Sequence, residues 1–309
     1  MINICFMGNP KFAVQTLDVL YNDENIDIKL VVSSADKKRN RGKVYPTEVK
    51  KYAQDKNLLV ESPKSVNTDE FVKRLVELEI DFIVVVAFGQ LIGDKLLNTF
   101  KDRIINLHPS KLPLYRGASP IQYSILFGEK ETAASSMLIE KGMDSGDILV
   151  QKKALIDIND DYLSLEDKLS KLGAEAIRES LINFDQIYKN RQAQDDDKAS
   201  FCKKISKDMG KIDWKSSSLD IYNKIRAFVE YPVAYFTYDS KNIKVYKAKI
   251  EENYKAKPGY VYESSPKKGL VIGTGDGAIR ILKIQAPGKR AMDTKSFLQG
   301  NKIEEKITL

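Results

Sequence analysis

The run Asp81-Phe82-Ile83-Val84-Val85-Val86-Ala87 is the most continuously apolar segment of this 309-residue chain. Because it is short and rich in β-branched residues, it predicts a strand with both faces buried, as in a parallel sheet. Strand-like and helix-like patterns alternate around it, which predicts an α/β fold with a doubly wound, mostly parallel sheet. The predicted strands cover residues 2–7, 28–33, 58–60, 81–87 and 103–107, and the predicted helices cover residues 12–21, 46–56 and 69–78.

Two glycine-containing turns bear on nucleotide binding. Gly8-Asn9-Pro10 follows the first predicted strand, and Asn9 is expected to cap the next helix with Pro10 at its first position. This turn lacks the G-x-G-x-x-G pattern of dinucleotide-binding proteins. The run Gly273-Thr274-Gly275-Asp276-Gly277 lies between two apolar stretches and predicts a hairpin turn. Neither turn indicates binding of NAD or ATP.

The second half of the chain has a different pattern. A helix is predicted over residues 165–183, a polar linker over 190–204 and a second helix over 218–228. Five short strands are then expected, at residues 234–238, 243–249, 259–262, 270–274 and 278–285. Short strands at this spacing are typical of a small, OB-like β-barrel. The sequence therefore predicts a catalytic domain over residues 1–189, the linker, and a C-terminal domain over residues 205–309.

The net charge of +7 is unevenly distributed along the chain. Residues 1–200 contain 28 basic and 31 acidic side chains, whereas residues 201–309 contain 22 basic and 12 acidic ones. A basic module of this kind indicates a polyanionic partner, and nucleic acid is the first candidate. A solvated, lysine-rich surface would have the same composition, so charge alone leaves both alternatives open.

Cysteine and histidine usage argues against a metal centre. The two cysteines, Cys5 and Cys202, lie far apart in the sequence, and His108 is the only histidine. No familiar zinc site can be assembled from these residues, and no metal is expected. The first apolar run, residues 2–7, has no basic leader and is too short to cross a membrane. We therefore expect a cytoplasmic protein without a membrane partner.

His108 is the only candidate for imidazole chemistry, and it follows a predicted strand in Asn106-Leu107-His108. Side chains two residues apart on a strand share one face, so Asn106 could add a hydrogen-bond donor beside the imidazole. A lone histidine is more often a surface or packing residue, and that alternative stays open at this point. Ligands of doubly wound sheets bind at the carboxyl ends of the strands, where this pair is expected.

A glycine-bracketed loop supplies candidate carboxylates. Residues 135–150 are predicted to form two strands that flank Gly142-Met143-Asp144-Ser145-Gly146-Asp147. Aspartates between glycines often stabilise turns through side-chain to backbone hydrogen bonds, and at least one of the two is expected to do so. The other is free to orient the imidazole, and the loop alone does not say which.

Two segments resemble folate-dependent formyltransferases. Residues 106–121 resemble that family's N-x-H-x-S-L-L-P-x-x-R-G-A-x-P-I segment, and residues 143–148 are similar to its L-D-T-G-D motif. The resemblance continues through Lys211-Ile212-Asp213-Trp214, Tyr231-Pro232 and residues 285–292, which resemble the C-terminal domain of the members that act on tRNA. It implies a Rossmann-like catalytic domain that transfers a formyl group from 10-formyltetrahydrofolate to the amine of initiator methionyl-tRNA, with no metal.

The same resemblance implies roles for individual residues. Asn106 and His108 would stabilise the oxyanion of the tetrahedral carbon, and Asp144 would hold the His108 tautomer. The implied folate-binding residues are Phe88, Gly89, Gln90, Ser110, Lys111, Leu112 and Pro113. The implied tRNA-binding residues are Arg41 and Lys43, in a basic loop at 36–44, with Lys289 and Arg290. Lys111 departs from the family pattern, in which an apolar residue is common, and a monomer is expected.

Two other functions remain in competition. A formyltransferase acting on a nucleotide sugar would share Asn106, His108 and Asp144, but is not expected to carry the basic C-terminal module. A non-enzymatic RNA-binding protein would explain the charge but leave those three residues unexplained.

Overall fold

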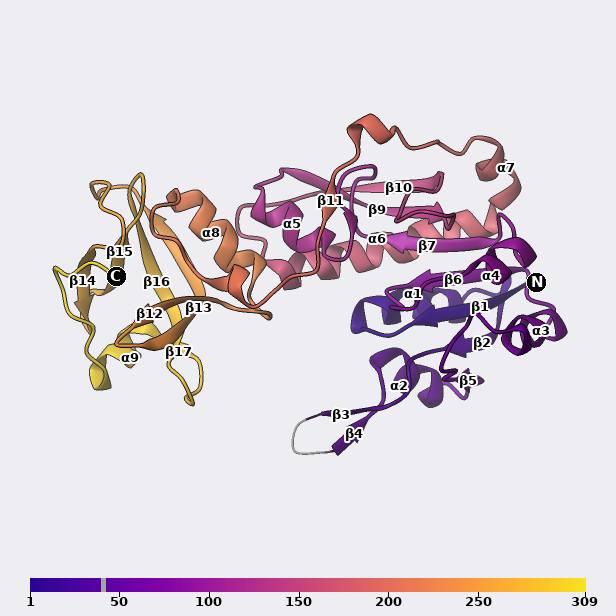
Figure 1. Cartoon of the computed structure of the whole chain (residues 1–309), viewed down its shortest axis with the longest axis horizontal. Helices are drawn as coiled ribbons and strands as arrows, with labels where there is room; N and C mark the ends of the chain where they lie inside the picture. Colours follow the sequence, from indigo (N-terminus) through magenta and orange to yellow (C-terminus); the bar gives the residue numbers. More distant parts are fainter. Residues whose placement is uncertain (40–42) are drawn as a thin grey trace. The chain divides into compact units, whose positions relative to one another are not determined.

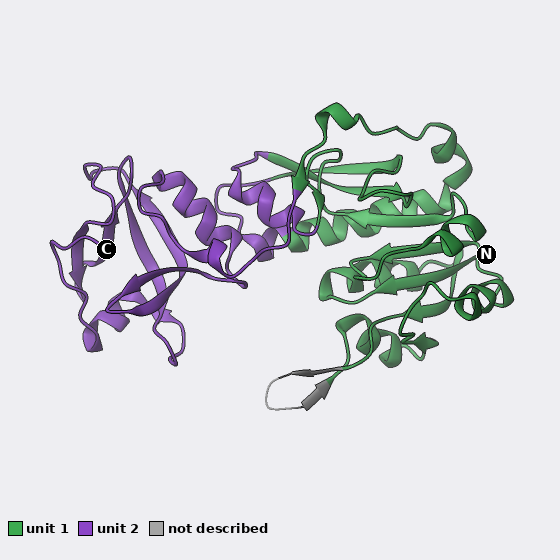
Figure 2. Cartoon of the chain, viewed as in Figure 1, with its two compact units in different colours: residues 1–117, 131–155, 166–201 green, residues 118–130, 156–165, 202–309 purple. Residues whose placement is uncertain are grey.

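The computed structural model describes the backbone of residues 1–39 and 43–309 and the side chains of residues 1–36 and 45–309. The chain divides into two compact units (Figure 2). Unit 1 contains residues 1–117, 131–155 and 166–201, and unit 2 contains residues 118–130, 156–165 and 202–309. Two short segments from the expected catalytic domain, residues 118–130 and 156–165, thus belong to unit 2. Most of the expected linker, residues 190–201, belongs to unit 1.

Unit 1 is built on a seven-stranded sheet with the strand order β10-β9-β7-β6-β1-β2-β5 (Figure 1). The five strands from β7 to β5 are parallel, and β9 runs antiparallel to both of its neighbours, β7 and β10. The strands are β1 (Ile2–Gly8), β2 (Ile26–Val32), β5 (Val60–Glu61), β6 (Phe82–Val86), β7 (Ile104–His108), β9 (Glu131–Leu138) and β10 (Ile148–Leu155). This confirms the predicted doubly wound, mostly parallel sheet.

Helices cover both faces of this sheet. One face packs into a cluster that includes Ile83 and Val85 of β6 with Phe71 and Leu96 from the helices. On the other face, Gly173 lies directly against the Leu107 side chain, where a Cβ would meet it at 2.5 Å. The helices are α1 (Lys11–Tyr21), α2 (Glu48–Asp55), α3 (Asp69–Glu77), α4 (Asp94–Thr99), α6 (Tyr162–Ile182) and α7 (Phe184–Lys189). Burial on both faces explains why β6 is apolar at every position.

The predicted capping role of Asn9 is wrong. Pro10 is the N-cap of α1, and no side chain caps this helix. The Asn9 amide donates instead to the carbonyl of Phe88, while its Oδ1 accepts from Ser33 Oγ at 3.0 Å and Ser34 N at 2.8 Å. Asn9 therefore ties together the carboxyl ends of β1, β2 and β6, because the parallel strands bring those ends to one edge.

The basic loop contains a short antiparallel hairpin of β3 (Lys37–Arg39) and β4 (Lys43–Tyr45). A second short pair joins β8 (Arg116–Gly117) to β11 (Phe201–Cys202), and two 3-10 turns occur at η1 (Asp196–Lys198) and η2 (Asp208–Gly210). The expected linker thus contains regular structure that is hydrogen-bonded to residues near His108.

Unit 2 contains an antiparallel sheet with the order β12-β13-β16-β15-β14, and β17 pairs with β16. Its elements are α5 (Pro120–Leu126), α8 (Ser218–Ala227), β12 (Ala234–Tyr238), β13 (Lys241–Glu251), β14 (Val261–Ser265), β15 (Gly269–Gly273), β16 (Ala278–Gln285), β17 (Met292–Asp293) and α9 (Thr294–Gly300). The Gly273–Gly277 run is the predicted hairpin turn between β15 and β16. Among the described residues no ladder joins β12 to β14, so the expected OB-like module is present as an antiparallel sheet.

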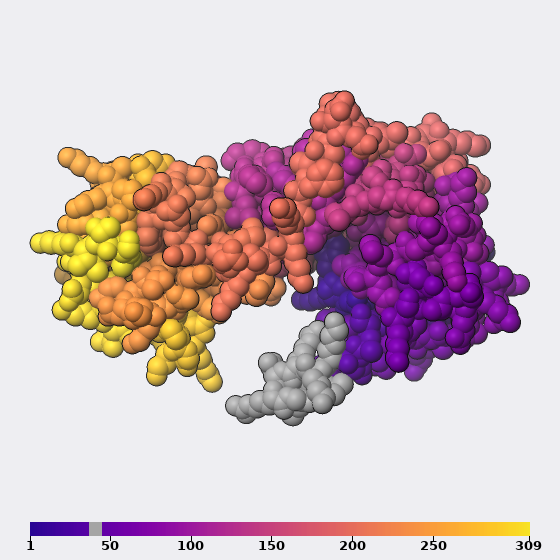
Figure 3. All heavy atoms as spheres, in the orientation of Figure 1, coloured from indigo at the N-terminus to yellow at the C-terminus, as the bar shows by residue number. Residues whose placement is uncertain are grey.

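The core of unit 2 combines sheet and helix residues, including Trp214, Phe236 and Ile225. The Arg226 side chain is buried, and its guanidinium donates to Asn223 Oδ1 at 3.0 Å and to the carbonyls of Asp157 and Asp160 at 3.2 and 2.9 Å. This arginine joins the 156–165 segment to α8. The last residues of the chain lie on the surface of the unit (yellow in Figure 3). Within the described residues, no helix is both long and apolar enough to cross a bilayer.

Candidate active site

Asn106 and His108 lie at the carboxyl end of β7, next to β6 in the middle of the sheet of unit 1. Because side chains alternate along a strand, both leave the sheet on the face that also carries Ile104. The His108 side chain is only 4% exposed, so it is a buried polar residue rather than a surface histidine. The structure therefore brings the predicted pair together at the edge where ligands of such sheets bind.

Both ring nitrogens of His108 face protein oxygens. Nε2 lies 2.9 Å from the carbonyl oxygen of Tyr115, and Nδ1 lies 3.5 Å from Oδ2 of Asp144. A carbonyl oxygen can only accept, so Nε2 must carry a proton and donate it. The distance to Asp144 exceeds that of a good hydrogen bond. Nδ1 is thus the ring nitrogen that is not firmly engaged.

Asp144, and not Asp147, is the carboxylate that faces the imidazole. Its Oδ2 accepts a hydrogen bond from the Gly117 amide at 2.8 Å, and its backbone has a positive φ of 51°. Asp147 instead pairs with Arg191, with Oδ2 2.7 Å from Nε. Asp144 is thus the aspartate that approaches His108, as the family resemblance implied, although the loop residues by themselves left the choice open.

The Asn106 side chain is half-buried, and among the described residues its amide has no hydrogen-bond partner. An amide that is bonded to no protein group, beside a buried histidine, is available to a ligand. The amide can donate two hydrogen bonds and accept two through its oxygen. Asn106 and the Nδ1 edge of His108 thus form a pair of polar groups at the end of β7.

The expected folate-binding residues after β6 serve mainly to shape the loop. Phe88 is buried in the core, and its carbonyl accepts the Asn9 amide. Gln90 accepts a hydrogen bond from the backbone amide of Val66 at 3.2 Å. Gly89 has a φ of 83°, and a Cβ there would face open space. The backbone groups of this loop, the Gln90 amide nitrogen and the space at Gly89 are left for a ligand.

The expected folate-binding residues after His108 are also anchored. Ser110 is fully buried and donates to the Leu114 carbonyl at 2.6 Å, and Leu112 packs in a small apolar cluster. Lys111 forms an ion pair with Glu131 at 2.7 Å, and this pairing holds the pKa of the Glu131 carboxyl below its usual range. The Pro113 carbonyl accepts from the Ser200 amide at 3.3 Å. This loop is therefore rigid next to His108, and the unusual Lys111 has a structural partner.

The expected tRNA-binding residues lie outside this cluster. Arg41 is outside the described residues, and only the backbone of Lys43 is described, in β4. Lys289 and Arg290 are exposed in the loop between β16 and β17 of unit 2. Neither forms an ion pair with another described residue, so both charges are accessible.

Sequence reasoning missed three groups that surround His108. They are the Tyr115 carbonyl, the Gly117 amide and the Gln194 side chain, whose Nε2 donates to the carbonyls of Asp144 and Gly146 at 2.9 and 2.7 Å. Backbone groups cannot be identified from residue types, because every residue has a carbonyl and all but proline have an amide N–H. Gln194 lies in a stretch that was predicted to be a polar linker. Of the described residues, no group of three or more His, Cys, Asp or Glu side chains could hold a metal.

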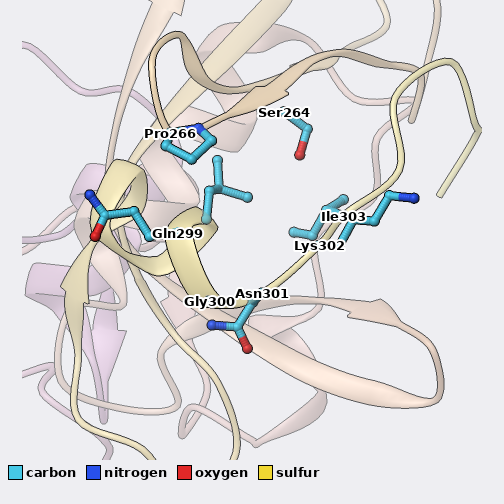
Figure 4. Close-up of a pocket in the computed structure, with 8 residues that line it drawn as sticks. Ser264, Pro266, Gln299, Gly300, Asn301, Lys302 and Ile303 are labelled. Atoms are coloured by element: carbon cyan, nitrogen blue, oxygen red, sulfur yellow. The ribbon is translucent and has the colours of Figure 1, made fainter.

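Two surface hollows lie away from His108. One is at the amino ends of the parallel strands in unit 1 and is lined by residues that include Asp81, Phe82 and Arg103. The other lies at the end of α9 in unit 2 (Figure 4). Its lining residues are Ser264, Pro266, Leu298, Gln299, Gly300, Asn301, Lys302 and Ile303. Lys302 is the only ionisable side chain among them, so this hollow offers no acid-base pair.

Comparisons with known proteins agree with this geometry. The sequence matches the formyl transferase family over residues 2–181 and the C-terminal domain of formyl transferases over residues 204–302. It is 41% identical to the methionyl-tRNA formyltransferase of Finegoldia magna, over 99% of both chains. It is also 41% identical to that of Caldanaerobacter subterraneus subsp. tengcongensis, over 98% of both. The solved structure of WlaRD, a sugar 3N-formyl transferase, is 26% identical with a TM-score of 0.66, over 94% of this chain and 99% of that one.

Proposed function

The chain belongs to the methionyl-tRNA formyltransferase family, and we propose that Asn106, His108 and Asp144 carry out the transfer that this family catalyses. The protein moves the formyl group of 10-formyltetrahydrofolate to the α-amine of initiator methionyl-tRNA, which yields N-formylmethionyl-tRNA for translation initiation. The observation that carries the residue assignment is the unpartnered Asn106 amide beside a buried histidine whose Nδ1 faces a carboxylate.

Asn106 supplies a hydrogen bond to the formyl oxygen. Negative charge grows on this oxygen when the amine adds to the formyl carbon, so a donor fixed in advance stabilises the transition state more than the ground state. One such preorganised donor contributes roughly 3–4 kcal/mol. The strand backbone fixes the position of Asn106 at the carboxyl end of β7, next to His108.

His108 acts through Nδ1. Nε2 already donates to the Tyr115 carbonyl, so Nδ1 is the nitrogen left for chemistry. With Nδ1 protonated, the imidazolium places positive charge beside the formyl oxygen. The Asp144 carboxylate lies 3.5 Å from Nδ1 and holds the ring in place. Asp144 in turn is fixed by the Gly117 amide.

The formyl transfer is balanced without a covalent bond between the formyl group and the protein. The amine forms a new C–N bond to the formyl carbon, and the C–N bond to the folate nitrogen breaks. The amine loses one proton and the departing folate nitrogen gains one, so His108 or water needs only to pass that proton between them. The 10-formyltetrahydrofolate fits this edge in two respects: Asn106 is unengaged, and the space at Gly89 is open.

Binding of the two substrates is assigned to separate groups. The folate lies against residues 88–90 and 110–113, where the loop backbones offer polar groups. The tRNA is bound by Lys289 and Arg290, exposed on unit 2, and by Arg41 and Lys43 of the basic loop. Lysine and arginine contacts of this kind neutralise phosphates and make affinity depend on salt.

The protein acts as a monomer in the cytoplasm. Asn106, His108 and Asp144 all belong to unit 1 of one chain, so a second copy is not needed to complete the site. The cytoplasm is where initiator tRNA is used.

The decisive test offers the purified protein 10-formyltetrahydrofolate with three acceptors in parallel: methionyl-tRNA, free methionine and a sugar-nucleotide amine. We expect formylation of methionyl-tRNA at a kcat/KM at least about a hundredfold above that of either alternative, because phosphate contacts add binding energy that small acceptors lack. Preferred formylation of the sugar amine would instead support the second candidate, a sugar formyltransferase, which the likeness to WlaRD raises.

A further inference from the structure

Residues 192–201, here named the clamp segment, contact both loops that hold His108. Gln192 pairs with Ile148 through two backbone hydrogen bonds of 2.8 and 2.9 Å, and further along, Ser200 binds the loop after His108. We propose that the clamp segment positions His108 for formyl transfer, with Gln194 and Ser200 as positioning residues. This inference rests on the proposed role of His108.

Gln194 holds the Asp144 side of the imidazole. Its amide nitrogen donates to the carbonyls of Asp144 and Gly146, so one side chain binds the two residues that flank Ser145. Asp144 has a positive φ, which is costly for a residue other than glycine and persists only where surrounding contacts enforce it. The Gln194 hydrogen bonds supply such contacts. The position of the Asp144 carboxylate, and hence its distance to Nδ1, depends on them.

Ser200 holds the Tyr115 side of the imidazole. Its Oγ accepts from the Tyr115 amide at 2.9 Å, and its carbonyl accepts from the Arg116 amide at 2.8 Å. Tyr115 also has a positive φ, of 59°. The Tyr115 carbonyl is the group to which His108 Nε2 donates. Ser200 therefore fixes the backbone that determines the His108 tautomer.

The two sides are joined through Arg116. This side chain is 4% exposed, and its Nε donates to Oε1 of Gln194 at 3.0 Å. One side chain of the clamp segment thus contacts both the loop of Asp144 and the loop of Tyr115. Misplacement of a catalytic group by about 1 Å can lower the rate about a hundredfold. A side chain that holds both hydrogen-bonding partners of His108 in place should therefore raise kcat.

The Gln194→Glu substitution tests whether Gln194 positions His108. The new carboxylate keeps an acceptor for Arg116 but places an oxygen opposite the carbonyls of Asp144 and Gly146, which repels them. Gln186→Glu on α7 is the matched control, because it makes the same change on an exposed side chain without a described hydrogen bond. We expect Gln194→Glu to lower kcat at least about tenfold with KM for methionyl-tRNA within about twofold, and Gln186→Glu to leave both unchanged.

The single histidine gives a readout independent of activity. With ¹⁵N-labelled histidine, all imidazole signals come from His108, so no assignment is needed. The unaltered protein should show Nε2 protonated in the neutral ring, because Nε2 donates to a carbonyl. Gln194→Glu should shift the Nδ1 resonance, whereas the spectrum of Gln186→Glu should coincide with that of the unaltered protein. A mutation that only lowers stability would not move this resonance in the folded protein.

Ser200→Ala provides a second variant if Gln194→Glu does not fold. Loss of the Oγ acceptor should shift the Nε2 resonance and lower kcat, since the Tyr115 backbone is then less restrained. The inference is overturned if a folded Gln194→Glu or, failing that, Ser200→Ala retains kcat within about twofold and leaves both imidazole nitrogen resonances unchanged. The His108→Ala variant separates the two claims: if it keeps full activity, the proposed function of His108 fails, whereas the resonance test of the clamp segment still stands.

Discussion

The carboxyl end of β7 in unit 1 and the β16–β17 loop in unit 2 hold their polar groups in opposite ways. His108 is buried, and both of its nitrogens face oxygens that other segments fix. Lys289 and Arg290 are exposed and have no ion-pair partner among the described residues. Chemistry on a carbonyl needs groups at fixed distances, whereas attraction of a polyanion needs only accessible charge. Substitutions at the end of β7 should therefore have non-additive effects on catalysis. Charge substitutions in the β16–β17 loop should have additive effects on polyanion binding.

The largest effect is expected at the end of β7. His108→Ala or Asn106→Ala should lower kcat/KM at least about a hundredfold, because each removes a group that stabilises the developing oxyanion. Steady-state kinetics at saturating folate measure this, and thermal unfolding checks that each variant is folded. The double variant should lose much less than the product of the two single losses, since the groups act on one oxygen. If the losses in kcat/KM of the two single variants multiplied in the double variant, Asn106 and His108 would not act on the same oxygen.

A second prediction concerns the buried charge within unit 2. Arg226→Met should destabilise the protein by about 2–3 kcal/mol, because it removes the charged hydrogen bonds from the buried guanidinium to the carbonyls of Asp157 and Asp160. Chemical denaturation measures the loss, and kcat per folded molecule should stay normal. If Arg226→Met instead lowered kcat and left the free energy of unfolding unchanged, Arg226 would have a catalytic role and not the structural role proposed.

Smaller effects are expected from the exposed charges. Lys289→Glu and Arg290→Glu should each weaken tRNA binding by about tenfold or less and reduce the slope of log affinity against log salt by about 1. Arg41→Ala should act in the same direction. Binding titrations at several salt concentrations measure the slope, and kcat at saturating tRNA should not change. An unchanged slope in all three variants would remove the assignment of these residues to tRNA.

The smallest effect is a pH-dependent one at the β15–β16 turn. Asp276 accepts a hydrogen bond from the Ser218 amide at 2.7 Å, and this bond lowers the pKa of the Asp276 carboxyl. A carboxyl whose folded-state pKa is depressed stabilises the protein above its unfolded pKa of about 3.9 and loses that contribution as the pH falls through the folded value. Asp276→Asn should therefore cost less than about 1 kcal/mol near pH 7, since the side chain is exposed. The difference should shrink below pH 4, and a pH-independent difference would exclude this cause.

Much of the fold could be predicted from local patterns. The strand over residues 82–86, the helix from residue 69 and the strands at 234–238 and 278–285 follow from runs of apolar or alternating residues. The short helices α4 and α5 were not predicted, because six or seven residues are too few to show a helical period. The prediction that Asn9 caps a helix is wrong, because the same side-chain amide can either cap a helix or join strand ends, and the sequence does not distinguish the two.

The candidate site shows the same division. Asn106, His108 and Asp144 could be named from their residue types and the family motifs. The composition of the loop did not distinguish Asp144 from Asp147, whereas the family motif indicated Asp144; the structure adds that Asp144 approaches His108 while Asp147 pairs with Arg191. Gln194 could not be found from the sequence, because its partners are carbonyl oxygens that every residue carries.

Local sequence patterns were enough to predict the doubly wound sheet and to identify a single histidine two residues after an asparagine at the end of one of its strands. These depend on local hydrophobic patterns and on residue types, which the chain carries without folding. Folding alone shows which nitrogen of His108 bonds to a carbonyl, how closely Asp144 approaches the other nitrogen, and which segments hold both partners. The physical reason is that hydrogen bonds to backbone groups form between segments as much as 85 residues apart, and only folding brings such segments within 3 Å of one another.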